Sequence, residues 1–256
     1  MNKRGLENAL YGLLRRYCRY TLKKEVKQNK VSEHAGITHL RGYGLHVSYP
    51  NWKVWLHQFI EIFCDDCYRV HKLKSRRPLI VDVGANVGMA TLYFKWRLPD
   101  AKVIAVEPDL DNIKYLVENI TNNQVENVRI VNAAVKEVSE SVSMVGGRTD
   151  SMRAVFSETG HRAVLLNSLI QEPCDFLKMD IEGSELEVLS SSQRALSLTD
   201  RVCIEYHQFR GRPFSLTDLV DRVMEGGFNR LAIDGHRTSE PSNPIEHYCL
   251  VHAWRD

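Results

Sequence analysis

The spacing of hydrophobic positions changes from residue 78 onward, where short apolar runs begin to alternate with longer amphipathic stretches. Short apolar runs are typical of buried strands, and apolar positions three and four apart are typical of helices. The pattern predicts strands at 79–83, 102–106, 127–131, 175–180 and 201–206, and helices at 88–98, 109–122, 184–196 and 215–226. This alternation indicates a doubly wound α/β fold, in which helices cover both faces of a parallel sheet.

The end of the chain departs from this alternation. Residues 228–233 and 249–254 are both predicted as strands, and the Gly, Pro, Ser and Asn residues between them indicate a loop without a helix. We therefore expect the two strands to pair antiparallel at the sheet edge, whereas a dinucleotide fold of two similar halves would continue with another crossover. Residues 133–174 are less regular, and we expect a small hairpin and a substrate-contacting loop there.

Residues 1–77 are predicted to form an N-terminal cap, and residues 78–256 the main domain. The cap contains a short strand at 42–48 and a helix at 52–71. Its first 30 residues carry nine Lys and Arg against two Glu, with apolar residues at helical spacing (Leu6, Leu10, Leu13, Leu14 and Tyr17). This pattern predicts a basic amphipathic helix docked on the domain. The alternative is peripheral contact of residues 1–30 with an anionic membrane.

The composition is that of an ordinary globular protein. The 256 residues are 43% hydrophobic and 26% charged, which suffices for one large α/β core with an N-terminal addition. The sequence shows neither an apolar run of membrane-spanning length nor a signal-peptide pattern. We therefore expect a cytoplasmic protein with reduced cysteines, associated with a membrane at most peripherally. The sequence leaves the oligomeric state open.

A glycine turn follows the first strand of the main domain, in the run Asp82-Val-Gly84-Ala-Asn86-Val-Gly88. Gly84 and Gly88 allow a tight turn and close approach of a ligand to the backbone, and the helix that starts near Gly88 offers free N–H groups. The next strand ends in Glu107, whose carboxylate can accept hydrogen bonds from both hydroxyls of a ribose. Together these features predict a cofactor that contains adenosine.

Two details favour S-adenosylmethionine over NAD as this cofactor. Asp82 would repel a pyrophosphate but suits a cationic amino group, and the turn lacks the three-glycine spacing of dinucleotide-binding proteins. Asn132 and Ala133, followed by Ala134 at the end of the third strand, could border the adenine. A plain strand-end turn is the alternative for these residues.

Acidic residues gather at the ends of two further strands. Asp180 and Glu182 follow one strand, and Glu205 and His207 alternate at the end of the next, so the four side chains are expected beside the cofactor. A carboxylate and an imidazole placed there can act as a general base for an attacking hydroxyl. One alternative is that His207 only forms a hydrogen bond to the backbone. Another is that the carboxylates and His207 bind a divalent metal ion; because their spacing matches no particular metal site, no metal is predicted. Glu185 is expected to cap the following helix.

In order and spacing, these motifs resemble the FkbM-type S-adenosylmethionine-dependent methyltransferases, a class I, Rossmann-like family. The resemblance covers roughly residues 78–210, and four segments carry it: Val81 to Gly88, Val106-Glu-Pro108, Val131-Asn-Ala-Ala134 and Phe176-Leu-Lys-Met-Asp-Ile-Glu-Gly-Ser-Glu185. It implies a seven-stranded, mostly parallel sheet whose last strand is antiparallel. It also implies transfer of a methyl group to a hydroxyl of a sugar or natural product.

By position, the resemblance also implies roles for the site residues. Asp82, Gly84, Asn86 and Gly88 would line the methionine end of the cofactor, and Glu107 would bind its ribose. Asn132 and Ala133 would border the adenine. Asp180 and Glu182 would face the methyl group that is transferred.

We therefore predict an S-adenosylmethionine-dependent O-methyltransferase that acts on a hydroxyl of a small molecule or glycan. Asp180, Glu182 and His207 are the predicted catalytic residues, and Asp180 is also expected to contact the cofactor. The alternatives are a nicotinamide-dependent oxidoreductase and a binding protein that keeps the fold without turnover. Nucleic acid is not the expected partner, because the chain beyond residue 30 is net acidic and shows no interleaving of aromatic and basic residues.

Overall fold

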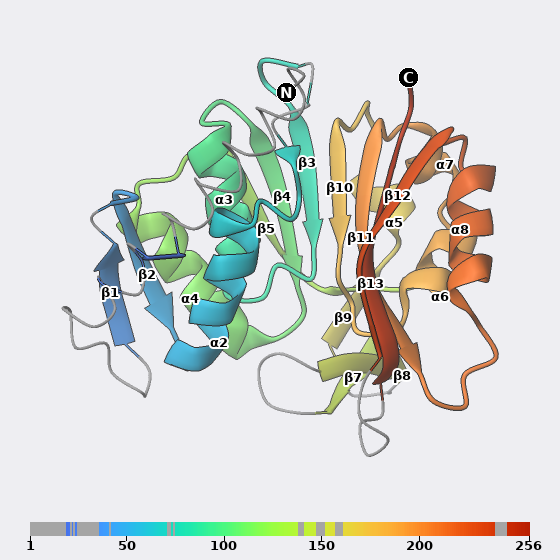
Figure 1. Ribbon diagram of the computed structural model, residues 1–256, viewed down its shortest axis with the longest axis horizontal. Helices are drawn as coiled ribbons and strands as arrows, with labels where there is room; N and C mark the ends of the chain where they lie inside the picture. The colour runs from blue at the N-terminus through green and yellow to red at the C-terminus, as the bar shows by residue number, and fades with distance from the viewer. Residues whose placement is uncertain are drawn as a thin grey trace, which may run out of the picture.

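The computed structural model describes residues 19–20, 22, 24, 36–40, 42–70, 73, 75–137, 141–146, 152–156, 161–238 and 245–256. Most of the predicted basic helix within residues 1–30 lies outside the described residues, as do 138–140, 147–151 and 157–160 of the expected loop. The main element is a seven-stranded sheet in the order β12, β13, β11, β10, β3, β4, β5 (Figure 1).

The strands of this sheet explain the predicted fold class. They are β3 Leu79–Val83, β4 Lys102–Glu107, β5 Val128–Asn132, β10 Phe176–Met179, β11 Arg201–Phe209, β12 Arg230–Thr238 and β13 Ile245–Trp254. Strand β13 lies between β11 and β12 and is antiparallel to both, whereas the other neighbouring strands are parallel. This arrangement confirms the mostly parallel sheet with an antiparallel last strand.

Helices cover both faces of the sheet (Figure 1). They are α3 Met89–Arg97 and α4 Leu110–Asn122 on one face, and α5 Leu166–Leu169, α6 Glu185–Ser190, α7 Gln193–Ser197 and α8 Leu216–Glu225 on the other. Neighbouring residues of β3 point to opposite faces, so Ile80 packs in one core cluster with Phe94 and Val81 in another with Leu189. Among the described residues, none of these helices is long and apolar enough to cross a membrane.

The described part of the cap contains a hairpin, the helix α2 and the helical residues 19–20, 22 and 24. Strands β1 Gly36–Leu40 and β2 Leu45–Tyr49 pair antiparallel, and α2 Trp52–Phe59 continues into a π-helical turn, η1 Ile60–Cys64. The predicted helix at 52–71 was therefore too long. The chain leaves the helix after Cys64, and Asp66 takes a left-handed φ of 53°, which no α-helix continues through.

Two further expectations concern the segments beside the site. The predicted helix at 184–196 is wrong as a single helix, because a turn separates α6 from α7. In this turn the Ser191 and Ser192 hydroxyls both donate to the Val188 carbonyl and compete with the helical hydrogen bonds.

The expected hairpin is confirmed as β7 Ser141–Gly146 and β8 Met152–Phe156, in a small sheet with β6 Ala134–Val135 and β9 His161–Val164.

Candidate active site

The glycine turn after β3 touches the tip of β10. Gly84 has a left-handed φ of 76°, and a Cβ there would lie 1.8 Å from the Asp180 carbonyl oxygen. Only glycine therefore allows these two strand ends to meet. A Cβ on Gly88 would lie 2.5 Å from the Leu116 side chain, so glycine lets the turn pack against α4; the predicted contact of Gly88 with the cofactor stays a prediction.

Asp82 lies beneath the turn rather than at the wall of a cavity. Its side chain is fully buried, the Thr91 hydroxyl donates to Oδ2 at 2.7 Å, and the Lys178 ammonium lies 3.3 Å from Oδ1. The two cavities of the site are lined by Gly84 and Asn86 but not by Asp82. The predicted contact of Asp82 with the cofactor stays a prediction, and the structure connects Asp82 to the site through Lys178.

Lys178 is the residue of this site that the sequence analysis missed. Its ammonium donates to the Gly84 carbonyl at 2.6 Å and lies 3.7 Å from Asp180 Oδ2. Burial lowers the pKa of Lys178, but the charges of Asp82 and Asp180 outweigh burial and raise it. The sequence does indicate this role, because Lys178 stands within an apolar strand and a buried lysine needs carboxylate or carbonyl partners nearby.

Glu107 lies at the tip of β4, where its buried carboxylate lines the smaller cavity of the site. Oε2 accepts from the Asn86 N–H at 2.8 Å, and Oε1 accepts from the Asp109 N–H at 2.9 Å. Burial raises the pKa of Glu107, and these backbone bonds oppose the rise. A carboxylate oxygen can accept more than one hydrogen bond, so Oε2 keeps capacity for a ligand hydroxyl.

Asn132 and Ala133 take different places at the end of β5. The Asn132 amide donates to the carbonyl oxygens of Glu107 at 3.1 Å and Pro108 at 2.9 Å, so it fixes the neighbouring strand end. Ala133 lines the smaller cavity together with Ala134. The amide nitrogen of Asn132 therefore holds the end of β4, and the predicted place of Asn132 beside the adenine stays a prediction.

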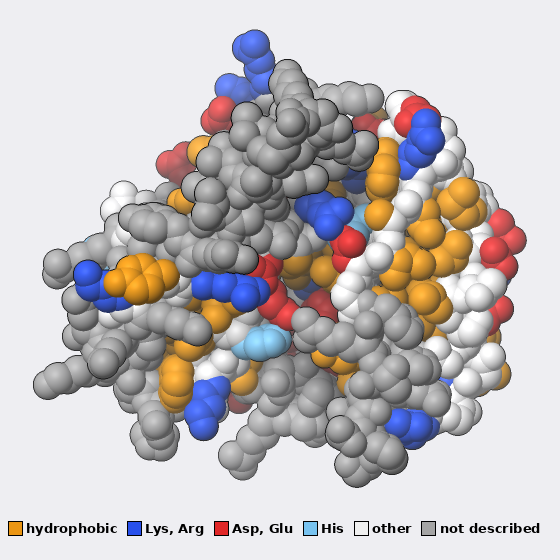
Figure 2. Space-filling model, viewed as in Figure 1, with side chains coloured by type: hydrophobic (Ala, Val, Ile, Leu, Met, Phe, Trp, Pro, Cys, Tyr) orange, Lys and Arg blue, Asp and Glu red, His pale blue; other side chains and the backbone are white. Residues whose placement is uncertain are grey.

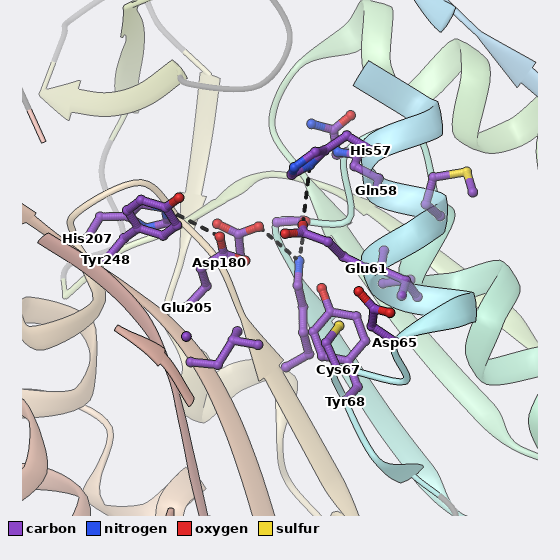
Figure 3. A pocket seen from close by; sticks show the side chains of 18 of the residues that line it. His57, Gln58, Glu61, Asp65, Cys67, Tyr68, Asp180, Glu205, His207 and Tyr248 are labelled. Atoms are coloured by element: carbon purple, nitrogen blue, oxygen red, sulfur yellow. Dashed lines mark hydrogen bonds and ion pairs between the residues drawn. The ribbon is translucent and has the colours of Figure 1, made fainter. Parts of the chain in front are cut away.

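A larger cavity of about 620 Å³ lies next to the smaller one. Helix α2 and η1 wall it on one side, and β11 to β13 on the other (Figure 3). Gln58, Gly84, Asn86, Asp180 and Glu182 line both cavities, so the two meet at the turn after β3. Figure 2 shows acidic, basic and histidine side chains together in the hollow near the centre of this face.

His207 and three carboxylates meet at the floor of the larger cavity. His207 Nε2 lies 3.6 Å from Glu182 Oε2 and 3.7 Å from Glu205 Oε1, and Nδ1 lies 3.4 Å from Glu185 Oε1. Asp180 points toward the same place from the end of β10 (Figure 3). The structure thus brings together the four residues that the sequence placed side by side, and it adds Glu185, which the sequence analysis had assigned to helix capping.

Two carboxylates of this group, Glu182 and Glu205, hold protons more tightly than ordinary ones. Burial, followed by the charge of Asp180, raises the pKa of Glu205 to about 7. Burial also raises the pKa of Glu182 to about 8, against the opposing charge of His207. The group can therefore take up and release protons near neutral pH.

The same residues offer oxygen and nitrogen ligands. One ligand atom each from Asp180, Glu205 and His207 lies within 4.8 Å of the others. The ammonium of Lys178 already faces Asp180 and supplies positive charge there. The prediction that the site holds no metal stays a prediction.

The fold and the site are those of a class I methyltransferase: a seven-stranded sheet with one antiparallel strand, a glycine turn and an acidic residue after the second strand. The family model of the methyltransferase FkbM domain matches residues 82–230, more than half of the chain. The chain belongs to this family of S-adenosylmethionine-dependent methyltransferases.

Two of the relatives that the chain matches are named methyltransferases. The chain is 53% identical to methyltransferase sdnD of Sordaria araneosa over 53 residues, 20% of this chain and 20% of that protein. It is 26% identical to methyltransferase 1 of Beauveria bassiana over 182 residues, 59% of this chain and 73% of that protein. The match to sdnD thus spans one fifth of that protein's length.

A solved structure of a methyltransferase-fold protein superposes on the chain with a TM-score above 0.5. TYW2 of M. jannaschii in complex with AdoMet superposes with a TM-score of 0.51 at 17% identity, over 88% of this chain and 89% of that chain. A methyltransferase FkbM from Methylobacillus flagellatus has a TM-score of 0.47 at 20% identity, over 77% of this chain and 53% of that chain.

The residues present fit the cofactor of this family. Gly84 and Asn86 line both cavities at the glycine turn, Glu107 presents a carboxylate at the smaller cavity, and Ala133 adds only a small side chain to the wall of that cavity. Adenosine needs a hydroxyl acceptor and apolar contacts, and the smaller cavity offers Glu107 together with Val106 and Pro108.

Proposed function

We propose that the chain methylates a hydroxyl group of a sugar, a glycan or another polyhydroxylated natural product. The observation that carries the proposal is the position of the His207 group (His207, Asp180, Glu182 and Glu205): all four residues line the larger cavity, and Asp180 and Glu182 also line the smaller one. One cavity offers Glu107 and the glycine turn to a nucleoside, and the other opens between α2 and β13. A group that accepts protons near neutral pH lies between them, which is the arrangement that transfer to a hydroxyl needs.

The cofactor would be held by residues on three strand ends. Glu107 would accept from the ribose hydroxyls, Ala133 would border the adenine, and the turn at Gly84 and Asn86 would hold the methionine end. When bound, S-adenosylmethionine supplies a methyl group on a positively charged sulfur. Asp180 and Glu182 line both cavities and would face that positive charge.

The proton of the acceptor hydroxyl would pass to the His207 group, whose side chains share it. In this group Nε2 of His207 lies between Glu182 and Glu205, so a proton received at one atom is shared with the others. Because the methyl donor is already activated, the main tasks of the protein are to align the hydroxyl and to remove its proton.

The larger cavity favours an uncharged, hydroxyl-rich acceptor. Six carboxylates and two lysines line it: Glu61, Asp65, Asp180, Glu182, Glu205, Asp234, Lys53 and Lys178. Carboxylates and amides bind hydroxyls well, and an excess of carboxylates repels phosphate. This charge balance disfavours RNA, although relatives from Neisseria named tRNA (guanine-N(7)-)-methyltransferases match 34% of the chain.

The test has a binding step and a transfer step. Calorimetry should show binding of S-adenosylhomocysteine and none of NADH; the reverse result would favour the nicotinamide oxidoreductase. Labelled S-adenosylmethionine is then offered with free sugars, lipid-linked sugars, polyketide alcohols and tRNA. A methyl ether found by mass spectrometry supports the proposal, and methylated tRNA or binding without any transfer contradicts it.

Variants test the assigned roles. His207→Ala and Asp180→Ala should each lower kcat by about a hundredfold or more while S-adenosylhomocysteine still binds. If both variants keep full turnover, these residues do not take part in the reaction.

A further inference from the structure

Glu185 is a buried carboxylate whose position helix capping does not explain. It is the first residue of α6 and is 1% exposed. Its Oε1 accepts from the Gly183 N–H at 2.9 Å and the Ile181 N–H at 3.4 Å, so the side chain folds back over the turn after β10. A carboxylate is costly to bury, so an apolar or amide residue would be the simpler helix start.

The same oxygen meets the imidazole of His207. The distance between Glu185 Oε1 and His207 Nδ1 is 3.4 Å, and both side chains are more than nine-tenths buried. An ionised carboxylate has only acceptor atoms, so this contact requires the hydrogen on Nδ1. The other ring nitrogen, Nε2, then faces Glu182 and Glu205 at the floor of the larger cavity.

We propose that Glu185 is a positioning residue that holds the His207 ring through Nδ1, so that Nε2 faces Glu182 and Glu205, the carboxylates with which it shares the acceptor proton. The catalytic consequence rests on the proposed function, but the coupling between the two side chains does not. The arrangement follows the general rule that a second group orients a working histidine through its other nitrogen.

Several charged groups besides Glu185 lie near His207 and also affect its pKa. Glu205 lies on the same strand, Asp180 directly after β10, and Glu182 in the turn before α6. Tyr248 of β13 lies opposite His207 in the sheet register. Burial lowers the pKa of His207, but the hydrogen bond and charge of Glu185 outweigh it, followed by the charges of Glu182 and Asp180, and the pKa is raised well above 6.5.

The experiment titrates His207 by nuclear magnetic resonance in the full chain without cofactor. Imidazole signals are followed against pH, and the spectrum of a His207→Gln variant assigns the His207 signal. In the parent protein, His207 should titrate above its ordinary pKa. Glu185→Gln keeps the shape and an acceptor oxygen but removes the charge, so the pKa of His207 should fall by about one unit or more.

Two variants serve as controls. Glu185→Asp retains the charge on a shorter side chain and should restore part of the shift. Glu187→Gln changes a carboxylate of the same helix that pairs with Arg212 at 2.8 Å, and it should leave the titration of His207 unchanged. In turnover assays, Glu185→Gln should lower kcat and move its pH profile, while KM for S-adenosylmethionine stays within about twofold.

Two results would overturn the proposal. One is a parent protein in which His207 titrates at or below its ordinary pKa, a measurement that needs no variant to fold. The other is a folded Glu185→Gln protein in which the titration of His207 is unchanged. Because neither measurement involves methyl transfer, a failure of the proposed function would leave the coupling of Glu185 and His207 standing, and the reverse holds too.

Discussion

Glu107 accepts a hydrogen bond from the backbone N–H of Asn86 at 2.8 Å, so the tip of β4 is joined directly to the glycine turn after β3. The two residues lie 21 positions apart and line the same small cavity. A carboxylate in this place both fixes the turn and remains available to a ribose. Its loss should therefore affect cofactor binding more than the later steps of the reaction.

The first prediction concerns Glu107→Gln. The amide oxygen can still accept from Asn86, but the charged acceptor for a ribose hydroxyl is lost. Hydrogen bonds to charged groups contribute about 1.5–3 kcal/mol, so S-adenosylhomocysteine should bind about tenfold or more weakly, with kcat nearly unchanged. Calorimetry measures the affinity, and Asp111→Asn on the exposed side of α4 is the control. Equal affinity in Glu107→Gln and the parent protein would contradict the assigned role.

The second prediction compares two glycines of similar backbone conformation. Gly84 has a φ of 76° and Gly44 a φ of 66°, but a Cβ would meet the Asp180 carbonyl at Gly84 and nothing within 4 Å at Gly44. Gly44→Ala should cost about 1 kcal/mol from left-handed strain alone. Gly84→Ala should cost clearly more and should weaken S-adenosylhomocysteine binding, because β3 and β10 must move apart. Denaturant unfolding and calorimetry measure both effects, and equal losses in the two variants would show that the contact with Asp180 does not matter.

Local sequence patterns predicted the sheet well, because a buried strand is a short apolar run and the residues at its end can be identified from that run alone. Asp180 and Glu205 were placed together because both follow predicted neighbouring strands. The contact between Glu185 and His207 joins residues 22 positions apart, and it depends on how the turn at 181–183 folds back. Glu182 and Gly183 take left-handed φ values of 57° and 94° in that turn. Periodicity does not reveal such a turn, so Glu185 was assigned to the helix instead.

The third prediction concerns the attachment of the cap. Asn119 of α4 is fully buried; its side chain accepts from the Ser48 N–H at 2.7 Å and donates to the carbonyl oxygens of Ser48 at 3.0 Å and Val87 at 2.7 Å. It thus joins the cap hairpin to the glycine turn. Asn119→Ala would leave buried backbone groups without partners, so the free energy of unfolding should fall by about 2–4 kcal/mol. Thermal or denaturant unfolding measures the loss, with Glu118→Ala of α4 as the control. A loss no greater than that of the control would mean that the cap is held mainly by apolar packing.

The last prediction follows from the raised pKa of Glu205, which is about 7 in the folded protein. In the unfolded chain Glu205 titrates near its ordinary value, about 4.3, so between these two values the folded state binds more protons. The contribution of Glu205 to stability is therefore present below about pH 4 and is lost as the pH rises through 7. Glu205→Gln stays neutral throughout and should match the parent protein below about pH 4.

Above pH 7 the two proteins should differ. The parent protein then holds a buried charge that the surrounding acids disfavour, even with His207 and Lys178 nearby. Glu205→Gln should accordingly be more stable than the parent at pH 8 by about 1–2 kcal/mol, a rise of several degrees in Tm. Its methyl transfer should fall at the same time, because the group loses a proton acceptor. A variant that is less stable than the parent at pH 8 would mean that the pairing of Glu205 with His207 outweighs the cost of burial, and the sign of this argument would be reversed.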